Sequence, residues 1–175
     1  MSNAQDPQRG LGRRMTFAAW AIGIAMVTLL FQSVLERRNN PNRSPQANVD
    51  ATGVREVVLR RNPYGHYVTA GRINDHPVTF MVDTGATQVA MSASLADRLG
   101  LARLAEGQSS TAGGLVTAYQ TRLDEVTIGP IRQSGVAASI LPSMEDDEVL
   151  LGMSFIKNLE LIQREDRLIL RQYPR

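Results

Sequence analysis

The apolar and polar positions divide the chain into two unlike parts. Residues 15–35 read MTFAAWAIGIAMVTLLFQSVL and hold no charged side chain. A helix rises about 1.5 Å per residue, so this run matches the thickness of the hydrocarbon core of a bilayer. From residue 53 to residue 175 the apolar residues instead come in short runs, separated by glycine, proline, asparagine and aspartate. This second pattern is typical of β-strands joined by tight turns.

The second part therefore predicts a mainly β fold. One helix is expected at Ser94–Leu99, because Ser94 and Asp97 resemble a capping box and Gly100 follows as a helix stop. Residues 154–159 are expected to form a helical turn. Many short strands with one or two short helices predict a small closed β-barrel or a closed sandwich. The expected strands cover residues 54–60, 66–73, 77–82, 115–121, 121–128, 131–141, 159–163 and 168–172.

The apolar run is best explained as a membrane anchor. Arginines flank it on both sides, and Trp20 stands near one end, where an indole ring favours the membrane interface. A buried core helix would show a polar face. A cleaved signal peptide would have a shorter apolar region and a small-residue cleavage site, which Val34 fits poorly. We expect a short tail at residues 1–14, one transmembrane helix at 15–35, a flexible tether at 36–52 and a folded domain at 53–175.

Composition and charge remove several classes of function. The chain is 43% hydrophobic and 21% charged, which is too apolar for a mostly disordered protein. Without cysteine it has no disulfide framework, cysteine-bound metal or thiol nucleophile. Residues 1–49 carry six arginines against two acids, whereas residues 50–175 carry 13 basic and 15 acidic residues. The folded part thus lacks a positive field for nucleic acid. Neither metal-ligand spacing nor a phosphate-binding loop is present, so no metal and no other cofactor is expected.

The stretch Phe80–Thr87, with the sequence FMVDTGAT, carries the most chemistry. Large apolar residues lead into Asp83, so its carboxylate emerges from a buried strand, where hydrogen bonds must hold its charge or it stays protonated. Gly85 allows a backbone N–H to approach that carboxylate, and the Thr84 hydroxyl can tie the loop to a neighbouring one. The plainest alternative for these residues is an ordinary Asx-type turn with glycine at a positive φ.

Residues 83–86, Asp-Thr-Gly-Ala, resemble the active-site loop of the retropepsin-like aspartic proteases. Two further stretches agree with this family in order and spacing. Residues 111–116 (TAGGLV) are similar to the flap, a glycine-bearing hairpin that closes over a bound peptide. Residues 149–153 (VLLGM) are similar to the segment whose glycine passes beside the catalytic loop. The resemblance extends from Val57 to Leu170 and implies a small closed β-barrel of the retropepsin type.

The resemblance also assigns roles to single residues. It makes Asp83 the catalytic aspartate, Thr84 the threonine that locks two active-site loops together, and Gly85 the glycine beside the catalytic water. The residues expected to contact substrate are Ala86, Gly113, Gly114 and Leu115.

One chain supplies half of the site that this chemistry needs. Asp-Thr-Gly occurs once in the sequence, whereas aspartic proteases place two carboxylates around one water. The acidic run that holds Asp146 and Asp147 is expected to be a solvated loop rather than a second active site. We therefore expect a homodimer, in which two-fold symmetry brings Asp83 of each subunit together.

The expected function is that of a membrane-anchored, homodimeric aspartic endopeptidase acting on protein or peptide substrates. Arginines on both sides of the apolar run leave the orientation open. The resemblance implies the bacterial inner membrane, with the catalytic domain in the periplasm. The alternatives are a membrane-tethered module that keeps the fold and captures extended peptides by strand addition, and a structural barrel of the cell envelope. Inhibition by a transition-state mimic would separate the enzyme from both.

Overall fold

The computed structural model describes residues 7–111, 113–144 and 147–174, and the chain divides into two compact units. The first unit ends at Arg38 and contains helix α1 (Pro7–Asn39) apart from its last residue. From Met15 to Asn39 this helix is long and apolar enough to cross a membrane, a property that signal sequences near an N-terminus share. Its large apolar side chains, such as those of Trp20 and Phe31, are exposed rather than packed into a core.

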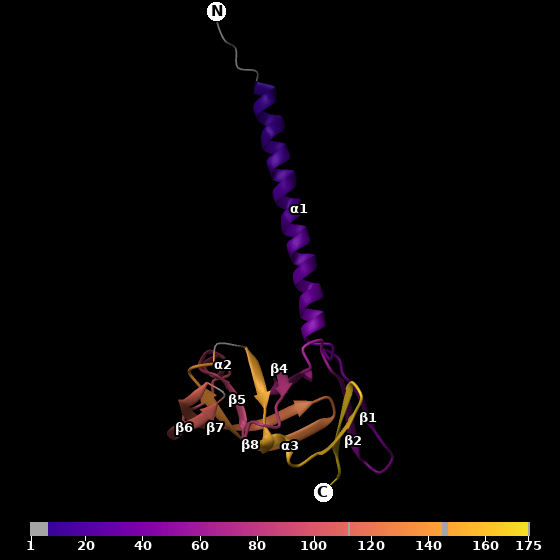
Figure 1. Cartoon of the computed structure of the whole chain (residues 1–175), viewed down its shortest axis with the longest axis vertical. Helices are drawn as coiled ribbons and strands as arrows, with labels where there is room; N and C mark the ends of the chain where they lie inside the picture. The colour runs from indigo at the N-terminus through magenta and orange to yellow at the C-terminus, as the bar shows by residue number, and fades with distance from the viewer. Residues whose placement is uncertain (1–6, 112, 145–146, 175) are drawn as a thin grey trace, which may run out of the picture. The chain divides into compact units, whose positions relative to one another are not determined.

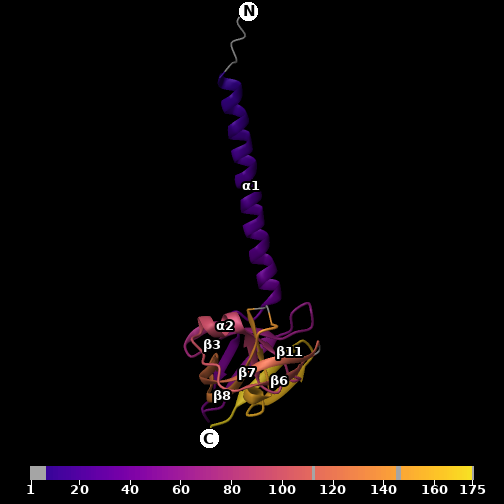
Figure 2. The same ribbon diagram turned by 90° about the vertical axis from the view of Figure 1, so that its left-hand side faces the viewer.

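The second unit, Asn39–Arg175, is built on a closed β-barrel. Among the described residues, seven strands form one sheet in the order β3-β4-β9-β5-β8-β7-β6. Strand β3 pairs again with β7, which closes the ring and leaves β6 outside it (Figures 1 and 2). The strands are β3 (Val68–Ile73), β4 (His76–Val82), β5 (Val89–Ser92), β6 (Glu106–Thr111), β7 (Gly114–Ile128), β8 (Ile131–Leu141) and β9 (Glu148–Leu151). The expectation of a mainly β fold with a small closed barrel is confirmed.

A second antiparallel sheet packs against the barrel. Its four strands in the described part of the chain have the order β1-β2-β11-β10. Val57 and Leu59 on β2, and Leu168 and Leu170 on β11, are buried in the same hydrophobic cluster as the barrel side chains. Their spacing of two residues is what a strand with one buried face requires. The strands are β1 (Gln46–Val49), β2 (Arg55–Arg60), β10 (Glu160–Arg164) and β11 (Arg167–Gln172).

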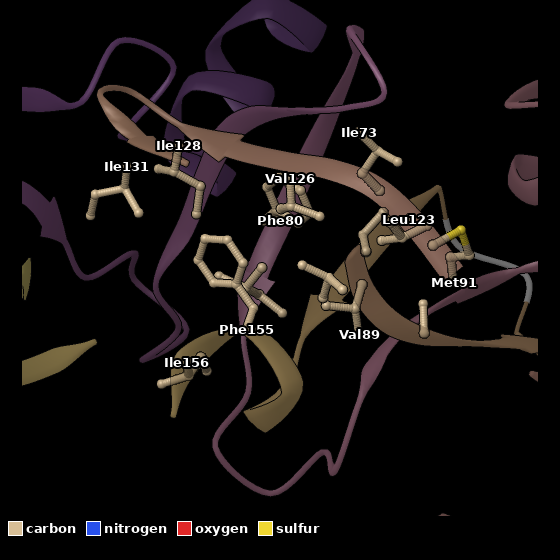
Figure 3. Packing of buried hydrophobic residues seen from close by; sticks show 14 of the residues in the cluster. Ile73, Phe80, Val89, Met91, Leu123, Val126, Ile128, Ile131, Phe155 and Ile156 are labelled. Carbon is tan, nitrogen blue, oxygen red and sulfur yellow. The ribbon is translucent and has the colours of Figure 1, made fainter. Parts of the chain in front are cut away.

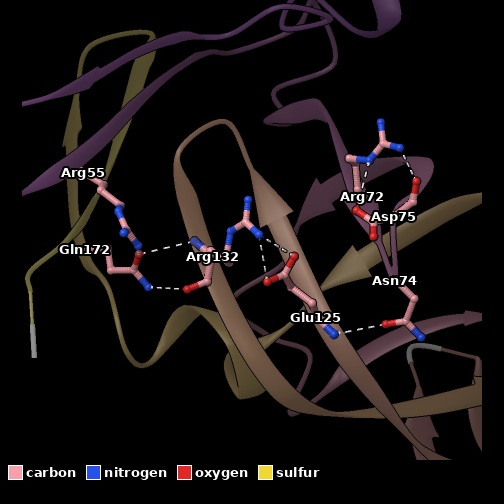
Figure 4. Close-up of polar contacts among 7 residues, drawn as sticks. All are labelled: Arg55, Arg72, Asn74, Asp75, Glu125, Arg132 and Gln172. Carbon is pink, nitrogen blue, oxygen red and sulfur yellow. Dashed lines mark hydrogen bonds and ion pairs between the residues drawn. The ribbon is translucent and has the colours of Figure 1, made fainter.

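Polar contacts join the two sheets at one edge. The side chain of Gln172 on β11 accepts a hydrogen bond of 3.3 Å from the backbone N–H of Arg132 on β8, and its amide nitrogen donates one of 2.8 Å to the Arg132 carbonyl oxygen. The Arg132 guanidinium contacts the Glu125 carboxylate on the neighbouring strand β7 at 3.1 Å (Figure 4). This network lies in a part of the barrel away from Asp83, so it holds the sheets together without entering the candidate site.

One hydrophobic core fills the barrel and the space beneath the second sheet. Phe80 on β4, Val126 on β7, Ile131 on β8 and Phe155 are fully buried and point into it (Figure 3). Burying a large apolar side chain contributes about 1.5–3 kcal/mol to stability. The core therefore fixes the position of β4, and with it the point where the chain leaves the barrel at Asp83.

Two short helices lie among the described residues of this unit, as expected: α2 (Ala93–Arg98) and α3 (Met153–Ile156). The cap of α2 differs from the prediction, because the Ser92 hydroxyl, not that of Ser94, accepts the hydrogen bond from the Leu95 N–H at 3.2 Å. Ser94 lies two residues later and shares a 3.0 Å hydrogen bond with Ser92. Strand β5 ends at Ser92, so the extended backbone that a cap residue needs is already in place there.

The segment at residues 36–52 differs from the flexible tether that its composition predicts. Helix α1 continues to Asn39, and residues 46–49 form strand β1, which pairs with β2. Between them Asn40 and Asn42 are buried, at 8% and 3% exposure. Asparagine side chains can satisfy backbone groups of neighbouring strands, so a polar segment need not be mobile. The compact unit accordingly begins at Asn39 rather than at residue 53.

Candidate active site

Two neighbouring segments hold Asp83 at the end of strand β4. The backbone N–H of Asp83 donates to the carbonyl oxygen of Leu151 on β9 at 3.2 Å, which continues the parallel pairing of Val82 with Leu151. On the other side, the Val82 N–H donates to the carbonyl oxygen of Tyr67 at 2.9 Å. The backbone that carries the candidate catalytic residue is thus clamped from both sides before the loop begins.

The loop then turns so that its own backbone faces the Asp83 carboxylate. The N–H of Gly85 donates to Asp83 Oδ1 at 2.9 Å, and the N–H of Ala86 donates to the Asp83 carbonyl oxygen at 3.3 Å. A β-carbon at residue 85 would lie only 3.2 Å from Oδ1. Among the described residues Oδ2 accepts no hydrogen bond, so the half-buried carboxylate keeps one oxygen for a ligand.

Residues 152–154 line up against the catalytic loop, as the sequence predicts for Gly152. The N–H of Met153 donates to the carbonyl oxygen of Ala86 at 2.8 Å, and the N–H of Ser154 donates to that of Thr87 at 3.0 Å. The Ser154 hydroxyl in turn accepts a 3.0 Å hydrogen bond from the N–H of Val89. Since a β-carbon at residue 152 would collide with the loop backbone, the glycine is what allows this approach.

Asp83 lies in a cleft of about 710 Å³. Sites that bind small ligands or peptide side chains commonly enclose about 300–1,000 Å³. The walls come from the loop that begins at Asp83, from β6 and the turn that follows it, and from β7, β8 and β9. Among the described lining residues, Asp83 carries the only ionisable side chain. The lining residues are Asp83, Gly85, Ala86, Thr87, Gln88, Ala90, Gly107, Gln108, Ser109, Ser110, Thr111, Gly113, Ala118, Gln120, Ser139, Leu141 and Leu150.

The predicted glycine-bearing hairpin is present next to this cleft. Strands β6 and β7 pair up to Thr111 and Gly114, and the Thr111 hydroxyl donates a 2.9 Å hydrogen bond to the Gly114 carbonyl oxygen. Gly114 has φ of +108°, a backbone conformation that favours glycine. The residue between Thr111 and Gly113 lies outside the described part of the chain. The hairpin therefore supplies one wall of the cleft through β6 and Gly113.

The structure brings together some of the predicted site residues and not others. Asp83, Gly85, Ala86 and Gly113 all line the cleft, whereas Thr84, Gly114 and Leu115 do not. Leu115 is 72% exposed. Thr84 is also exposed, and its hydroxyl makes no hydrogen bond with the residues that the structure describes.

Sequence reasoning missed a polar pair in the wall of the cleft. The Ser139 hydroxyl on β8 donates a 2.9 Å hydrogen bond to Gln88 Oε1. Both side chains are half-buried and line the cleft. The available signal was Ser139 itself, the single hydroxyl inside the apolar run Val136–Leu141. Its partner lies 51 residues away along the chain, which no local pattern reveals.

The structure describes two residues of the acidic run at 145–148, namely Asp147 and Glu148. Asp147 is exposed and pairs with Arg98 of α2 at 2.6 Å. Glu148 opens β9, and Asp146 lies outside the described residues. In the described part of the chain, no group of three or more His, Asp or Glu side chains is placed to hold a metal ion.

Known proteins are similar to this chain in sequence and in fold. Residues 69–158 match the family described as "gag-polyprotein putative aspartyl protease". An uncharacterized protein in the cobV 5′ region of Sinorhizobium sp is 36% identical over 126 residues, which cover 70% of this chain and 54% of that protein. The chain thus spans about half the length of this curated relative.

A solved structure agrees with both matches. The retropepsin-like aspartic protease from Rickettsia conorii is 26% identical, with a TM-score of 0.57 over 73% of this chain and 94% of that one. The matched family segment contains Asp83, the hairpin formed by β6 and β7, and Gly152, which are the features that build the cleft. The chain therefore belongs to the family of retropepsin-like aspartic proteases.

Proposed function

We propose that the protein is a membrane-anchored aspartic endopeptidase that acts as a homodimer. One observation carries this proposal: Asp83 presents one carboxylate oxygen to the Gly85 N–H and leaves the other unpaired in a cleft with no second ionisable group among its described residues. A carboxylate placed in this way can bind a water molecule and take a proton from it. Membership of the protease family makes peptide hydrolysis the reaction to expect.

The reaction needs a second carboxylate, as in aspartic proteases generally. Two carboxyl groups that face each other around one water share a proton, because both cannot be ionised at such short distance. The ionised carboxylate takes a proton from the water while the water oxygen attacks the carbonyl carbon of the peptide bond. The protonated one donates its proton to the carbonyl oxygen. Collapse of the tetrahedral intermediate then breaks the C–N bond: the nitrogen leaves with a proton from the dyad, and one hydroxyl of the intermediate returns a proton to the dyad.

A second copy of the chain is the source we propose for that carboxylate. Asp-Thr-Gly occurs once in the sequence, and Asp83 has no carboxylate neighbour among the residues that line its cleft. Thr84 supports the same arrangement, because its exposed hydroxyl has no partner among the described residues. Across a two-fold axis beside Asp83, the two loops would meet and each Thr84 would gain a partner in the other subunit.

The anchor and the compartment belong to the proposal as well. Helix α1 has the length and apolar composition of a membrane span. We propose that it holds the enzyme in the bacterial inner membrane with the barrel in the periplasm. A protein fused after residue 175 that is active on only one side of the membrane tests this orientation directly.

Substituting Asp83→Asn in the full-length chain tests the catalytic assignment. Purified in detergent, the wild-type protein is expected to cleave members of a peptide library, and D83N is expected to lose this activity while keeping its melting temperature. Asp124→Asn is the matched control, because Asp124 is an exposed aspartate on β7 that does not line the cleft. Binding of a transition-state mimic without any cleavage by the wild type would instead support the non-catalytic peptide-binding module.

Mixing the two proteins tests the dimer. Suppose that each active site takes one Asp83 from each subunit. A one-to-one mixture of wild-type and D83N subunits, exchanged to equilibrium, should then have about a quarter of the activity of the same total amount of wild-type protein. A mixture that retains about half would mean that each chain acts alone.

A further inference from the structure

The connection between the apolar helix and the barrel is much shorter than the sequence predicts. The apolar run ends at Leu35, and the compact barrel unit begins at Asn39. Only Glu36, Arg37 and Arg38 lie between them. The length of this connection depends on how firmly the residues from Asn39 onward are held by the barrel.

Asn39 is bound to the barrel unit through both its side chain and its backbone. Its side-chain amide nitrogen donates a 2.8 Å hydrogen bond to Glu148 Oε1 at the start of β9. Its carbonyl oxygen accepts a 3.0 Å hydrogen bond from the side chain of Asn62, which is itself buried at 5% exposure. The first residue of the barrel unit thus already contacts two other segments of that unit.

Asn42 is held more firmly, between strands β2 and β3. Its amide nitrogen donates to the carbonyl oxygens of Arg60 and Val68 at 2.9 and 2.7 Å, and its Oδ1 accepts from the Arg60 N–H at 2.7 Å. Its own carbonyl oxygen accepts from the N–H of Ala70 at 3.1 Å. Pulling Asn42 away would leave the buried Val68 carbonyl oxygen unpaired, at a cost of about 1–3 kcal/mol, and would also remove two part-buried contacts to Arg60. The residues from Asn39 onward therefore add no free length to the connection between the apolar helix and the barrel.

We propose that the enzyme cleaves peptide bonds in chains anchored to its own membrane, within a narrow range of heights above the bilayer. This substrate class rests on the proposed function, including the membrane anchor. A fully extended chain spans at most about 3.6 Å per residue, so three linking residues reach about 11 Å. A free tether over residues 36–52 would have reached about 60 Å. The short connection therefore sets an upper limit on how far the cleft can rise above the bilayer.

A limited height selects substrates by position as well as by sequence. A bond held at the height of the cleft in the same membrane meets the enzyme at high effective concentration, whereas a bond held far above it cannot be reached. The segments of membrane proteins just outside the bilayer meet this condition. Both subunits of the dimer must also lie in one membrane, which restricts the approach of the substrate further.

Reconstitution into vesicles with a graded set of substrates tests this proposal. Each substrate carries one cleavable peptide raised above its own transmembrane helix by an (EAAAK)n spacer, which extends about 1.5 Å per residue where helical. The full-length enzyme is expected to cleave substrates within one range of spacer lengths, at least tenfold faster than those with the longest spacers. Inserting 20 Gly/Ser residues between Arg38 and Asn39 should extend cleavage to the longer spacers.

A soluble peptide separates failure of this proposal from failure of the proposed function. The native enzyme and the insertion variant are expected to cleave this peptide at equal rates, because a soluble peptide reaches the cleft whatever its height above the bilayer. Equal cleavage of all tethered substrates by the native enzyme would overturn the height restriction while leaving the protease assignment intact. Loss of the native chain from vesicles on flotation, or no cleavage of any peptide, would overturn the proposed function and this inference with it.

Discussion

Gly152 passes so close to Gln88 that a β-carbon at residue 152 would lie 2.1 Å from the Gln88 carbonyl oxygen. The same atom would lie 2.7 Å from the carbonyl oxygen of Ala86. The φ of Gly152 is −87°, which any residue can adopt, so the requirement for glycine is one of space alone. Through this contact the end of β9 supports the loop that carries Asp83.

Gly152→Ala should therefore lower both stability and activity. The methyl group must push aside backbone rather than a mobile side chain, and overpacking of this kind costs roughly 1–3 kcal/mol in the free energy of unfolding. Peptide hydrolysis should fall further than stability alone explains, because the catalytic loop moves. Chemical denaturation and kcat/KM measure the two effects. Gly107→Ala is the control, since Gly107 also lines the cleft but a β-carbon there would have no atom within 4 Å; equal effects of the two substitutions would contradict the contact.

Asn42→Ala should destabilise the barrel although it lies 41 residues before Asp83. The substitution removes three hydrogen bonds from the side chain, and it leaves the buried Val68 carbonyl oxygen and the part-buried N–H and carbonyl of Arg60 without these partners. We expect a loss of roughly 2–4 kcal/mol in the free energy of unfolding. Asn48→Ala serves as the control, because Asn48 is exposed on strand β1. A loss no larger than that of the control would show that the segment is the loose tether that its composition predicts.

Stability should decline in acid partly through Asp50. Hydrogen bonds from the Thr52 hydroxyl and the Val54 N–H hold the pKa of the Asp50 carboxyl below its ordinary value. The ionised form is therefore favoured in the folded chain. Its stabilising contribution is complete above the ordinary value of about 3.9 and is lost as the pH falls through the lower folded value.

Thermal melts of the wild type and Asp50→Asn check this contribution. The wild type should melt at a higher temperature than D50N at pH 6, and the difference should shrink below about pH 3. Asp124→Asn, at an exposed aspartate, should show no comparable change between the two pH values. A difference between the wild type and D50N that stays the same at both pH values would contradict the role of the Asp50 charge.

The pair formed by Ser139 and Gln88 should influence which peptides are cleaved. Ser139 binds Gln88 Oε1, so the amide nitrogen of Gln88 remains to donate to an oxygen of the substrate, in a cleft where Asp83 is the only ionisable side chain among the described lining residues. Ser139→Ala should raise KM about fivefold for peptides with an asparagine or glutamine near the scissile bond, with little change in kcat. Ser143→Ala is the control, being exposed and outside the cleft. An equal rise in KM for peptides without asparagine or glutamine would contradict the role of Ser139 and Gln88 in substrate selection.

The features predicted correctly from sequence are those that rest on local patterns. Alternating apolar residues predict three of the four strands of the second sheet, β2, β10 and β11; on β11, Leu168 and Leu170 are buried and their neighbours are less so. The two strands expected at 115–121 and 121–128 form one strand, β7, because nothing in that stretch breaks the pairing with β8. Strands β1, β5, β6 and β9 were missed. The sequence of β6, EGQSST, is polar on both faces, since this strand pairs only at the outside of the ring.

The features that were missed depend on contacts between distant segments. Asn42 resembles any polar linker residue until β2 and β3 surround it. Ser92 becomes a helix cap because β5 delivers it there, while Ser94 has the better local pattern. Asp83 and Gly152 were found because two short motifs lie in a familiar order. Gln88 and Ser139, by contrast, are joined only by the pairing of β5 with β8.

Strand β7 joins the hairpin beside the cleft to the core of the barrel. It runs without interruption from the exposed tip of the hairpin at Gly114 to Ile128 in the buried core, and no glycine or proline interrupts it after Gly114. Pairing with β8 begins at Tyr119, so residues 114–118 extend beyond the part of β7 that β8 holds. Any movement of the hairpin tip relative to the barrel would therefore have to bend β7 itself, because the strand offers no glycine or proline between the two.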